Sequence, residues 1–259
     1  MSALRTPEVV LTIAGTDSGG AAGIAADLAT FADLGAHGAC VVAAVTAQDT
    51  TAVLEIHRVP ASVVDAQLAA VLGDLPVTAT KTGMLGSAEV VDLVADRFSS
   101  LSTPLVVDPV LIASSGAALG DAAMVAAYRE RLLPVATVVT PNLAEALVLL
   151  GEDGPPDELA TALAARGPAV VLTGGTAYGT CTDWIAEPGE RPVPLHHPAV
   201  ETRNDHGTGC TFSAALAVHL AHGAPLLAAA RGAAAYTTAQ LEQSQSWMLG
   251  RGRGPIAHT

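Results

Sequence analysis

Two kinds of apolar pattern alternate along the chain. The first is a short run rich in β-branched residues, such as VVLTIAG at 9–15 and PLVVDPV at 104–110, which is typical of strands buried on both faces. The second places apolar residues near helical spacing, as in 22–35, which ends at a glycine as many helices do. This alternation predicts an α/β fold, with a parallel sheet between two layers of helices.

The same two patterns continue to the end of the chain. Further strands are predicted at 38–48, 77–83, 136–142 and 169–175, and further helices at 63–75, 87–98, 121–133, 143–151, 158–167, 209–222 and 225–242. Ser87 is a good N-cap for the helix that follows it. Residues 176–200 hold four prolines and scattered charges, which indicates a surface hairpin or flap. Because no Gly-, Ser- or Pro-rich linker and no internal repeat divides the chain, we interpret residues 1–259 as one domain.

The composition favours helices packed on a sheet and excludes nucleic acid as a partner. Half of the 259 residues are hydrophobic, mostly Ala, Val and Leu, while aromatic residues make up only 3%. The 25 acidic and 12 basic residues give a net charge of −13, which repels a phosphate backbone. A phosphate-bearing ligand would therefore need backbone amides, a metal ion or a few local cations.

Cysteine usage and the N-terminal sequence predict a cytoplasmic protein. Cys40, Cys181 and Cys210 cannot all pair, and none belongs to a CxxC motif, which fits a reducing compartment. The segment MSALRTPEVVLTIAG predicts a strand rather than a signal peptide. No run of 18 clean apolar residues occurs, so no membrane span is expected.

Polar and glycine-rich segments follow the predicted strands one after another. They are GTDSGGAAG (15–23), TAQDT (46–50), KTGML (81–85), DPVLIASSG (108–116), TPNLAEA (140–146) and TGGTAYG (173–179). In open α/β sheets, ligands bind outside the carboxyl ends of the strands. The repeated placement therefore predicts a ligand site at this edge. GTDSGGAAG matches neither GxxxxGK[ST] nor GxGxxG, so by itself it indicates only a tight turn.

The segment NDHGTGCT (204–211) precedes an apolar helix. A helix N-terminus presents free N–H groups and a partial positive charge, and Gly207 and Gly209 let a ligand approach the backbone. The turn can therefore hold a phosphoryl group, although it could also be only a glycine-rich cap. The same helix end is expected to lower the pKa of Cys210, which would then be a base or nucleophile. The alternative is a small buried residue.

Four other side chains at the strand ends carry candidate chemistry. The Gln48 amide both donates and accepts, which suits the edge of a heterocycle, although it could only order its loop. Asp108 and Glu145 could hold Mg²⁺, while Glu145 could equally be a solvated charge. Lys81 is the only lysine, and either contacts phosphate or substrate or extends its charge to solvent.

In order along the chain, these segments resemble the ribokinase-like superfamily. HGTGCT is similar to the signature of its vitamin-kinase branch, whereas most sugar kinases of this fold have an aspartate at the position of Cys210. The cysteine form, together with GTDSGGAAG, AQDT, KTGML, DPVLIASSG and TPNLAEA, resembles the hydroxymethylpyrimidine/phosphomethylpyrimidine kinases of thiamine biosynthesis. The resemblance extends from about residue 9 to the tail GRGPIAH. It implies a three-layer α/β/α fold with a central, mostly parallel sheet.

The resemblance also implies a reaction and a set of roles. ATP would phosphorylate the hydroxymethyl group of 4-amino-5-hydroxymethyl-2-methylpyrimidine, and the same site would convert the monophosphate to the diphosphate. The substrate would be bound by Gln48, Gly15, Asp17 and Met84, and ATP would contact Asn142, Thr173, Gly175 and Thr208. The expected catalytic residues are Cys210 as base and Gly207, Thr208 and Gly209 as anion hole. Mg²⁺ would be held by Asp108 and Glu145. A homodimer is also implied.

Three positions depart from the family pattern. The first loop lacks a proline that is usual there, and Thr173 replaces a lysine expected near the ATP phosphates. Asp205 stands where threonine is common, and it could hold a cation or Arg203 or, if unpaired, weaken phosphate binding. Two alternatives therefore stay open, namely a pyridoxal/pyridoxine kinase and a non-catalytic pyrimidine-binding regulatory protein.

Overall fold

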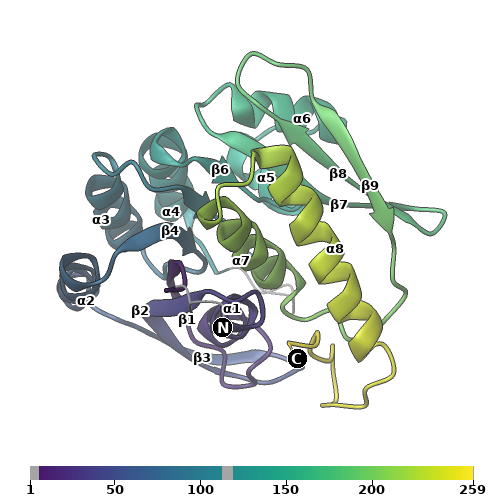
Figure 1. Cartoon of the computed structure of the whole chain (residues 1–259), viewed down its shortest axis with the longest axis horizontal. Helices are drawn as coiled ribbons and strands as arrows, with labels where there is room; N and C mark the ends of the chain where they lie inside the picture. Colours follow the sequence, from purple (N-terminus) through teal and green to yellow (C-terminus); the bar gives the residue numbers. More distant parts are fainter. Residues whose placement is uncertain (1–5, 113–118, 259) are drawn as a thin grey trace, which may run out of the picture.

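A computed structural model describes residues 6–112 and 119–258 of the chain. Within these ranges, nine strands form one sheet in the order β3-β2-β1-β4-β5-β6-β7-β8-β9 (Figure 1). The strands are β1 (Val9–Gly15), β2 (His37–Gln48), β3 (Val53–Arg58), β4 (Val77–Thr82), β5 (Leu105–Val107), β6 (Val138–Val139), β7 (Ala169–Ala177), β8 (Thr180–Ala186) and β9 (Val193–Pro198). The six strands from β2 to β7 in this order pair in parallel, which confirms the predicted fold class.

The two ends of the sheet are antiparallel, and the sequence did not reveal this. At one end β3 pairs with β2, and its residues are all partly or fully exposed, so no buried apolar run marks it. At the other end β7, β8 and β9 pair in sequence. Of the two alternatives predicted for 176–200, the structure has the hairpin, formed by β8 and β9, and this hairpin extends the central sheet, which the sequence did not indicate.

Helices cover both faces of the sheet. One face carries α1 (Gly23–Asp33) and α7 (Thr208–Ala221), and α8 (Leu226–Ser244) packs against α7 and β9. The other face carries α2 (Ala61–Asp74), α3 (Ala88–Phe98), α4 (Ala122–Ala127), α5 (Leu143–Leu150) and α6 (Pro156–Ala164). The described residues contain no helix long and apolar enough to cross a membrane.

The apolar side chains of the strands contribute to two separate hydrophobic cores, one on each face of the sheet. In β1, Val9, Leu11 and Ile13 belong to the core on the side of α2, α3 and α4, whereas Val10, between Val9 and Leu11, belongs to the core on the side of α7 and α8. All seven residues of β1 are buried, as the continuous apolar run predicts. Each strand end is thus held from both sides, which places the loops that follow at a rigid edge.

Helix boundaries follow local capping and proline chemistry. Ser87 accepts a hydrogen bond from the Val90 N–H at 3.3 Å, as expected of an N-cap. The predicted helix at 121–133 instead divides into α4, a π-helical turn (Tyr128–Leu132) and a 3₁₀ turn (Leu133–Val135). Pro134 has no N–H to continue the α-helical pattern, so this segment ends in the tighter turn.

Candidate active site

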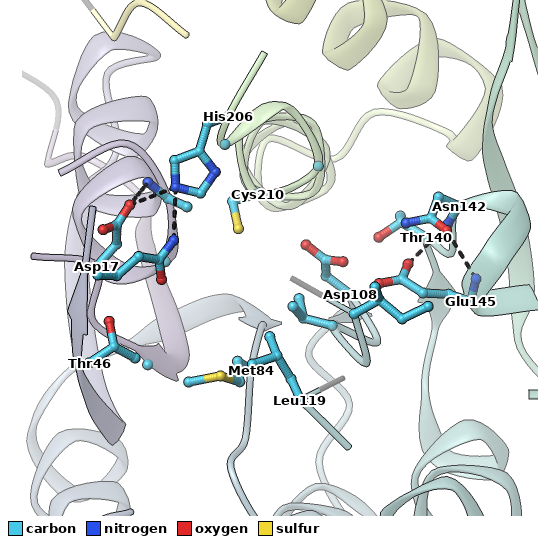
Figure 2. A pocket seen from close by; sticks show the side chains of 18 of the residues that line it. Asp17, Thr46, Met84, Asp108, Leu119, Thr140, Asn142, Glu145, His206 and Cys210 are labelled. Atoms are coloured by element: carbon cyan, nitrogen blue, oxygen red, sulfur yellow. Dashed lines mark hydrogen bonds and ion pairs between the residues drawn. The ribbon is translucent and has the colours of Figure 1, made fainter. Parts of the chain in front are cut away.

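A pocket of about 160 Å³ lies at the carboxyl ends of the parallel strands (Figure 2). Eleven of the predicted site residues line it: Gly15, Asp17, Gln48, Met84, Asp108, Asn142, Glu145, Thr173, Gly207, Gly209 and Cys210. Thr208 and Gly175 do not. The Thr208 hydroxyl donates to the Asp205 carbonyl at 2.7 Å, and Gly175 pairs with Thr182 inside the sheet. Residues 113–116 of the segment DPVLIASSG lie outside the described residues.

One end of the pocket is built around a buried histidine. His206 Nε2 lies 3.0 Å from Asp17 Oδ2 and 3.0 Å from the Gln48 amide nitrogen. Asp17 also accepts hydrogen bonds from the N–H groups of Gly19, Ala21 and Ala22, so its carboxylate orders the glycine-rich loop. Burial opposes ionisation of Asp17, but the hydrogen bonds from His206 and the loop amides outweigh it and lower its pKa.

His206 is a pocket residue to which sequence reasoning assigned no role. His206 stands in NDHGTGCT, directly before Gly207. The sequence feature that could have pointed to it is a histidine in the glycine turn at the start of a helix. Its partner Asp17 lies 189 positions away in the sequence. No local pattern indicates a contact of this kind, because the fold alone brings the two loops together.

Glycines shape the walls of this end of the pocket. A Cβ at Gly15 would collide with the Met84 methyl group, and a Cβ at Gly23 would collide with the Gly15 carbonyl oxygen. Gly23 also has φ of +58°, which favours glycine. The Met84 side chain therefore packs closely against Gly15 and gives this end of the pocket an apolar surface, while Asp17 and His206 give it a polar one (Figure 2).

The N-terminus of α7 forms another wall. Gly207 caps this helix with φ of +94°, and a Cβ there would collide with the Ala21 carbonyl oxygen. A Cβ at Gly209 would meet no protein atom within 4 Å, so the missing side chain leaves free space above the first turn. The first-turn amides have no intrahelical acceptor and carry partial positive charge. This wall can hold an anion.

Cys210 lies between the two ends of the pocket, as Figure 2 shows. Burial raises the pKa of its thiol to about 12, and the carboxylates of Asp108 and Asp27 add to the effect. The charge of Lys81 and the Gly23 N–H act in the opposite direction but do not outweigh burial. The lowering influence expected of the helix start is therefore outweighed by burial, and the thiol is the resting form at neutral pH.

Lys81 lies beneath the pocket and neither lines it nor reaches solvent. It is fully buried, and its Nζ lies 2.8 and 2.9 Å from the two oxygens of Asp27 and 3.9 Å from Asp108 Oδ2. Thr12 donates to Asp27 Oδ2 at 2.6 Å. Burial would lower the pKa of Lys81, but the charges of Asp27 and Asp108 outweigh burial and raise it. Both predicted roles for Lys81 are therefore wrong, and it is instead a buried cation that neutralises the floor of the site.

Asp108 and Glu145 form the opposite end of the pocket (Figure 2). Both are buried, and burial followed by repulsion from Asp108 raises the pKa of Glu145 to about 8. Burial also raises the pKa of Asp108, while Lys81 opposes this. The buried position shows that Glu145 is not the solvated charge considered above. Two close carboxylates that resist ionisation together are a suitable donor set for a divalent cation.

Asn142 positions Glu145 through a reciprocal cap at the start of α5. The Asn142 side chain accepts from the Glu145 N–H at 3.0 Å, and the Glu145 carboxylate accepts from the Asn142 N–H at 3.0 Å. Thr173 lies beside this cap, because its N–H donates to the Pro141 carbonyl at 2.9 Å. The carboxylate is thus oriented by the helix start itself.

Asp205 is paired, although not with the predicted partner. Arg253 Nε lies 2.7 Å from its Oδ1, and Arg253 Nη2 lies 2.5 Å from its Oδ2. The suggestion of Arg203 is therefore wrong. The C-terminal tail that carries Arg253 runs beside residues 203–206, where Gly254 accepts from the His206 N–H. Its guanidinium offsets the negative charge that the sequence places next to the anion site.

Comparison with known proteins identifies the family. Residues 17–257 match the family model for phosphomethylpyrimidine kinase. The chain belongs to the phosphomethylpyrimidine kinase family. A hydroxymethylpyrimidine/phosphomethylpyrimidine kinase of Rhizobium meliloti is 45% identical over 256 residues, which cover 96% of each chain. The thiamine biosynthesis bifunctional protein of Geobacter sulfurreducens is 43% identical, and the match covers 96% of this chain and 52% of that protein.

A solved structure supports the same fold for this family member. Pyridoxal kinase of Bacillus subtilis, in complex with ADP, superimposes with a TM-score of 0.89 at 34% identity, covering 97% of each chain. The predicted ribokinase-like fold and the predicted family resemblance are both confirmed.

Proposed function

We propose that the chain transfers a phosphoryl group from ATP to 4-amino-5-hydroxymethyl-2-methylpyrimidine and then to its monophosphate, as a step of thiamine biosynthesis. The family match over residues 17–257 and the named relative in Rhizobium meliloti support this function. The observation that carries it is the pocket itself, which has an apolar and hydrogen-bonding end, a carboxylate end and a helix N-terminus between them. ATP as co-substrate agrees with the ADP complex of the Bacillus subtilis pyridoxal kinase.

The pyrimidine would lie at the end formed by Met84 and Gly15. Met84 offers a polarisable apolar surface for the ring, and the Gln48 amide offers both a donor and an acceptor for the ring edge. Asp17 and His206 hold this end in shape through their mutual hydrogen bond. The hydroxymethyl group would then point towards Cys210 and the start of α7.

Phosphoryl transfer at this site would rest on positioning and charge stabilisation. The first-turn amides around Gly207 and Gly209 face the place where charge develops on the transferring group, which costs no rearrangement at the moment of reaction. Cys210 is the candidate acceptor for the substrate's hydroxyl proton, but it can accept a proton only as the thiolate. Because its thiol pKa is about 12, we assign most of the rate acceleration to the amides.

Asp108 and Glu145 would hold Mg²⁺ when it is bound. The ion would supply neutralisation of the ATP phosphate charge. The donor set fits, because burial raises the pKa of both carboxylates, Asp108 raises that of Glu145 further, and a cation would stabilise both in the ionised form. Asn142 keeps the Glu145 carboxylate oriented for this purpose.

A pyridoxal kinase activity is the second candidate, because the Bacillus subtilis pyridoxal kinase has nearly the same fold and is 34% identical. Both substrates are hydroxymethyl heteroaromatics. The pairing of Asp205 with Arg253 removes one of the two reasons for considering a non-catalytic protein, and Thr173 alone remains.

An ADP-release assay with Mg-ATP tests this function. Hydroxymethylpyrimidine, its monophosphate and pyridoxal are compared for the wild type, Cys210→Ala and, as a matched control, Cys40→Ala, which changes an exposed cysteine outside the pocket. We expect turnover of both pyrimidines by the wild type and by Cys40→Ala, and a reduced rate for Cys210→Ala. Turnover of pyridoxal alone would transfer the function to the second candidate. Binding of the pyrimidine without ADP release would contradict a kinase.

A homodimer in the cytoplasm is part of the same proposal. Val45 and Leu54, on the two strands at one end of the sheet, expose apolar side chains that a second copy could cover. All three cysteines are free, which fits a reducing compartment. Sedimentation analysis checks the assembly, and a monomer at micromolar concentration would contradict it.

A further inference from the structure

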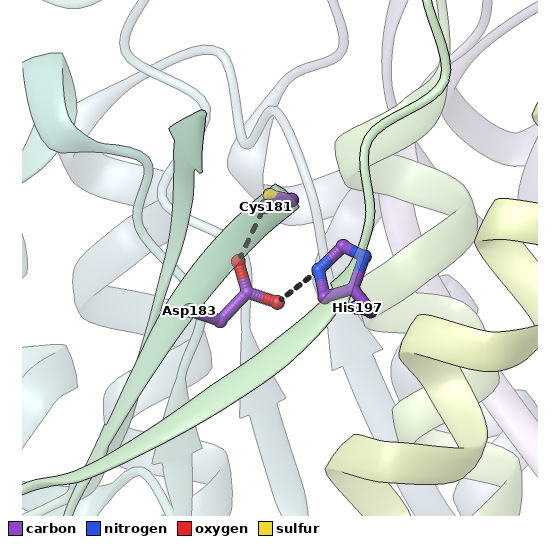
Figure 3. Close-up of side chains that lie close together, drawn as sticks. All are labelled: Cys181, Asp183 and His197. Carbon is purple, nitrogen blue, oxygen red and sulfur yellow. Dashed lines mark hydrogen bonds and ion pairs between the residues drawn. The ribbon is translucent and has the colours of Figure 1, made fainter. Parts of the chain in front are cut away.

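Three side chains of metal-binding type meet on the β8–β9 hairpin, outside the pocket described above (Figure 3). Cys181 and Asp183 are two residues apart on β8, so they share a face, and His197 of β9 lies directly opposite Cys181. His197 Nε2 is 3.1 Å from Asp183 Oδ2, and Cys181 Sγ is 3.9 Å from Asp183 Oδ1. The three potential ligand atoms all lie within 4.8 Å of one another.

These separations are close to those of a metal centre. Bonds of about 2.0–2.3 Å at tetrahedral angles place neighbouring ligand atoms roughly 3.3–3.8 Å apart. The His197–Asp183 and Cys181–Asp183 distances of 3.1 and 3.9 Å bracket that range. Small side-chain rotations would therefore suffice, and the antiparallel backbone would stay in place.

The hydrogen bonding of His197 leaves its Nε2 directed at the cluster. Its Nδ1 lies 3.3 Å from the Pro198 carbonyl oxygen and 3.4 Å from the Thr238 hydroxyl oxygen, and a proton on Nδ1 satisfies the carbonyl, which only accepts. Nε2 then faces a carboxylate oxygen, and two lone pairs would repel each other unless a proton or a metal cation lies between them.

The surroundings supply the outer contacts that metal ligands commonly have. The buried Asp183 keeps its Oδ1 oriented by the Gly174 N–H at 2.9 Å, and the Pro198 carbonyl fixes the ring of His197. A surface hollow of about 620 Å³ is lined in part by His197, Thr238 and Glu242, so the His197 side of the cluster adjoins solvent.

We propose that Cys181, Asp183 and His197 bind one divalent transition-metal cation of the Zn²⁺ class, with the fourth coordination position open to water. Thiolate, carboxylate and imidazole together are the donor set that such cations prefer. Binding would replace the Nε2 proton of His197 and the Sγ proton of Cys181, and both protons would pass to solvent. The thiolate and the carboxylate then balance the charge of the ion, so the site is neutral before and after binding.

The first test uses the full-length wild type with its thiols reduced and without ATP. Added Zn²⁺ should protect Cys181 from alkylation by iodoacetamide, as read by peptide mass spectrometry, while the exposed Cys40 reacts as before. Unchanged alkylation of Cys181 at saturating Zn²⁺ would overturn the proposal. This measurement needs no variant and does not depend on kinase activity.

The second test uses Co²⁺ as a spectroscopic probe. The wild type should show a thiolate-to-cobalt charge-transfer band, and Cys181→Ser and His197→Asn should weaken binding by about 100-fold or more. Cys40→Ser and His196→Asn are the matched controls and should keep the band, because Cys40 lies on β2 and His196 bonds to Thr182 instead. A band that persists in folded Cys181→Ser would place the metal at another thiol, such as Cys210, and would overturn the assignment.

Discussion

Gly207 and Gly209 stand two positions apart at the start of α7, and the structure requires glycine at each for a different reason. Gly207 has φ of +94° and no room for a side chain beside the Ala21 carbonyl. Gly209 is exposed, and its missing side chain leaves space into which a phosphoryl group would fit. The first glycine serves the fold, and the second serves the proposed ligand.

Substitution of each glycine by alanine should separate the two roles. We expect Gly209→Ala to fold normally, because alanine favours a helix by up to about 1 kcal/mol over glycine. Its kcat should fall on the order of 100-fold, because the new methyl group obstructs the amides. Gly207→Ala should fold poorly. Gly73→Ala, at an open helical position of α2, is the control and should leave kcat unchanged. Full activity of Gly209→Ala would exclude phosphoryl binding at this turn.

At the scale of elements, a buried ion pair joins α1 to β4 below the site. Lys81 and Asp27 have no exposed side-chain surface, and Asp108 after β5 shares the positive charge. Removing one partner of such a pair leaves an uncompensated buried charge, whereas replacing both by apolar groups is often tolerated. Substitution of Lys81 or Asp27 alone should therefore destabilise the protein more than substitution of both together.

Lys81→Met should lower the free energy of unfolding by about 3–5 kcal/mol, and Lys81→Met with Asp27→Leu should recover most of that loss. The double variant should still have reduced kcat, because Asp108 and Cys210 would lose a neighbouring cation. Urea unfolding and the ADP-release assay measure the two effects. Arg97→Met, which breaks an exposed pair with Asp65, serves as the control and should cost about 0.2–1 kcal/mol. If Lys81→Met and Arg97→Met lowered the free energy of unfolding by similar amounts, burial would not be what makes the Lys81–Asp27 pair important.

At the scale of the whole molecule, the carboxylates of the pocket couple stability to pH. The pKa of Glu145 rises from 4.5 in the unfolded chain to about 8 in the folded one. The folded chain thus holds this proton more tightly. The stabilisation that results from the raised Glu145 pKa is complete below pH 4.5, and this stabilisation is lost as pH rises through about 8. The proposed cation would need the ionised form, so function and stability favour opposite charge states of this residue.

Glu145→Gln should therefore flatten the pH dependence of stability. Between about pH 5 and about pH 9 the wild type should lose on the order of a few kcal/mol relative to the variant, because glutamine mimics the neutral acid. Thermal unfolding in a pH series measures this. Glu190→Gln, at an exposed turn, is the control and should follow the wild type. Parallel curves for Glu145→Gln and the wild type would show that the Glu145 pKa is not raised.

Much of the fold is predictable because its signals are local. The continuous apolar run of β1 and the N-cap of Ser87 depend on nearby residues only, and both occur as expected. The exposed strand β3 has no apolar run of its own, and β8 and β9 join the sheet only through pairing with β7. Eleven of the predicted site residues meet in one pocket because parallel strands end at the same edge.

The sequence by itself determined the alternation of strands and helices, the edge at which ligands would bind and the residue types gathered there. Only the tertiary structure decided the charge states and the partners. It largely surrounds the thiol of Cys210 with protein and raises its pKa, pairs Asp205 with Arg253, and joins His206 to Asp17 across 189 positions. The physical reason is that hydrophobic periodicity and capping act over a few residues. Burial and charge pairing, in contrast, depend on which distant segments the packed sheet brings together.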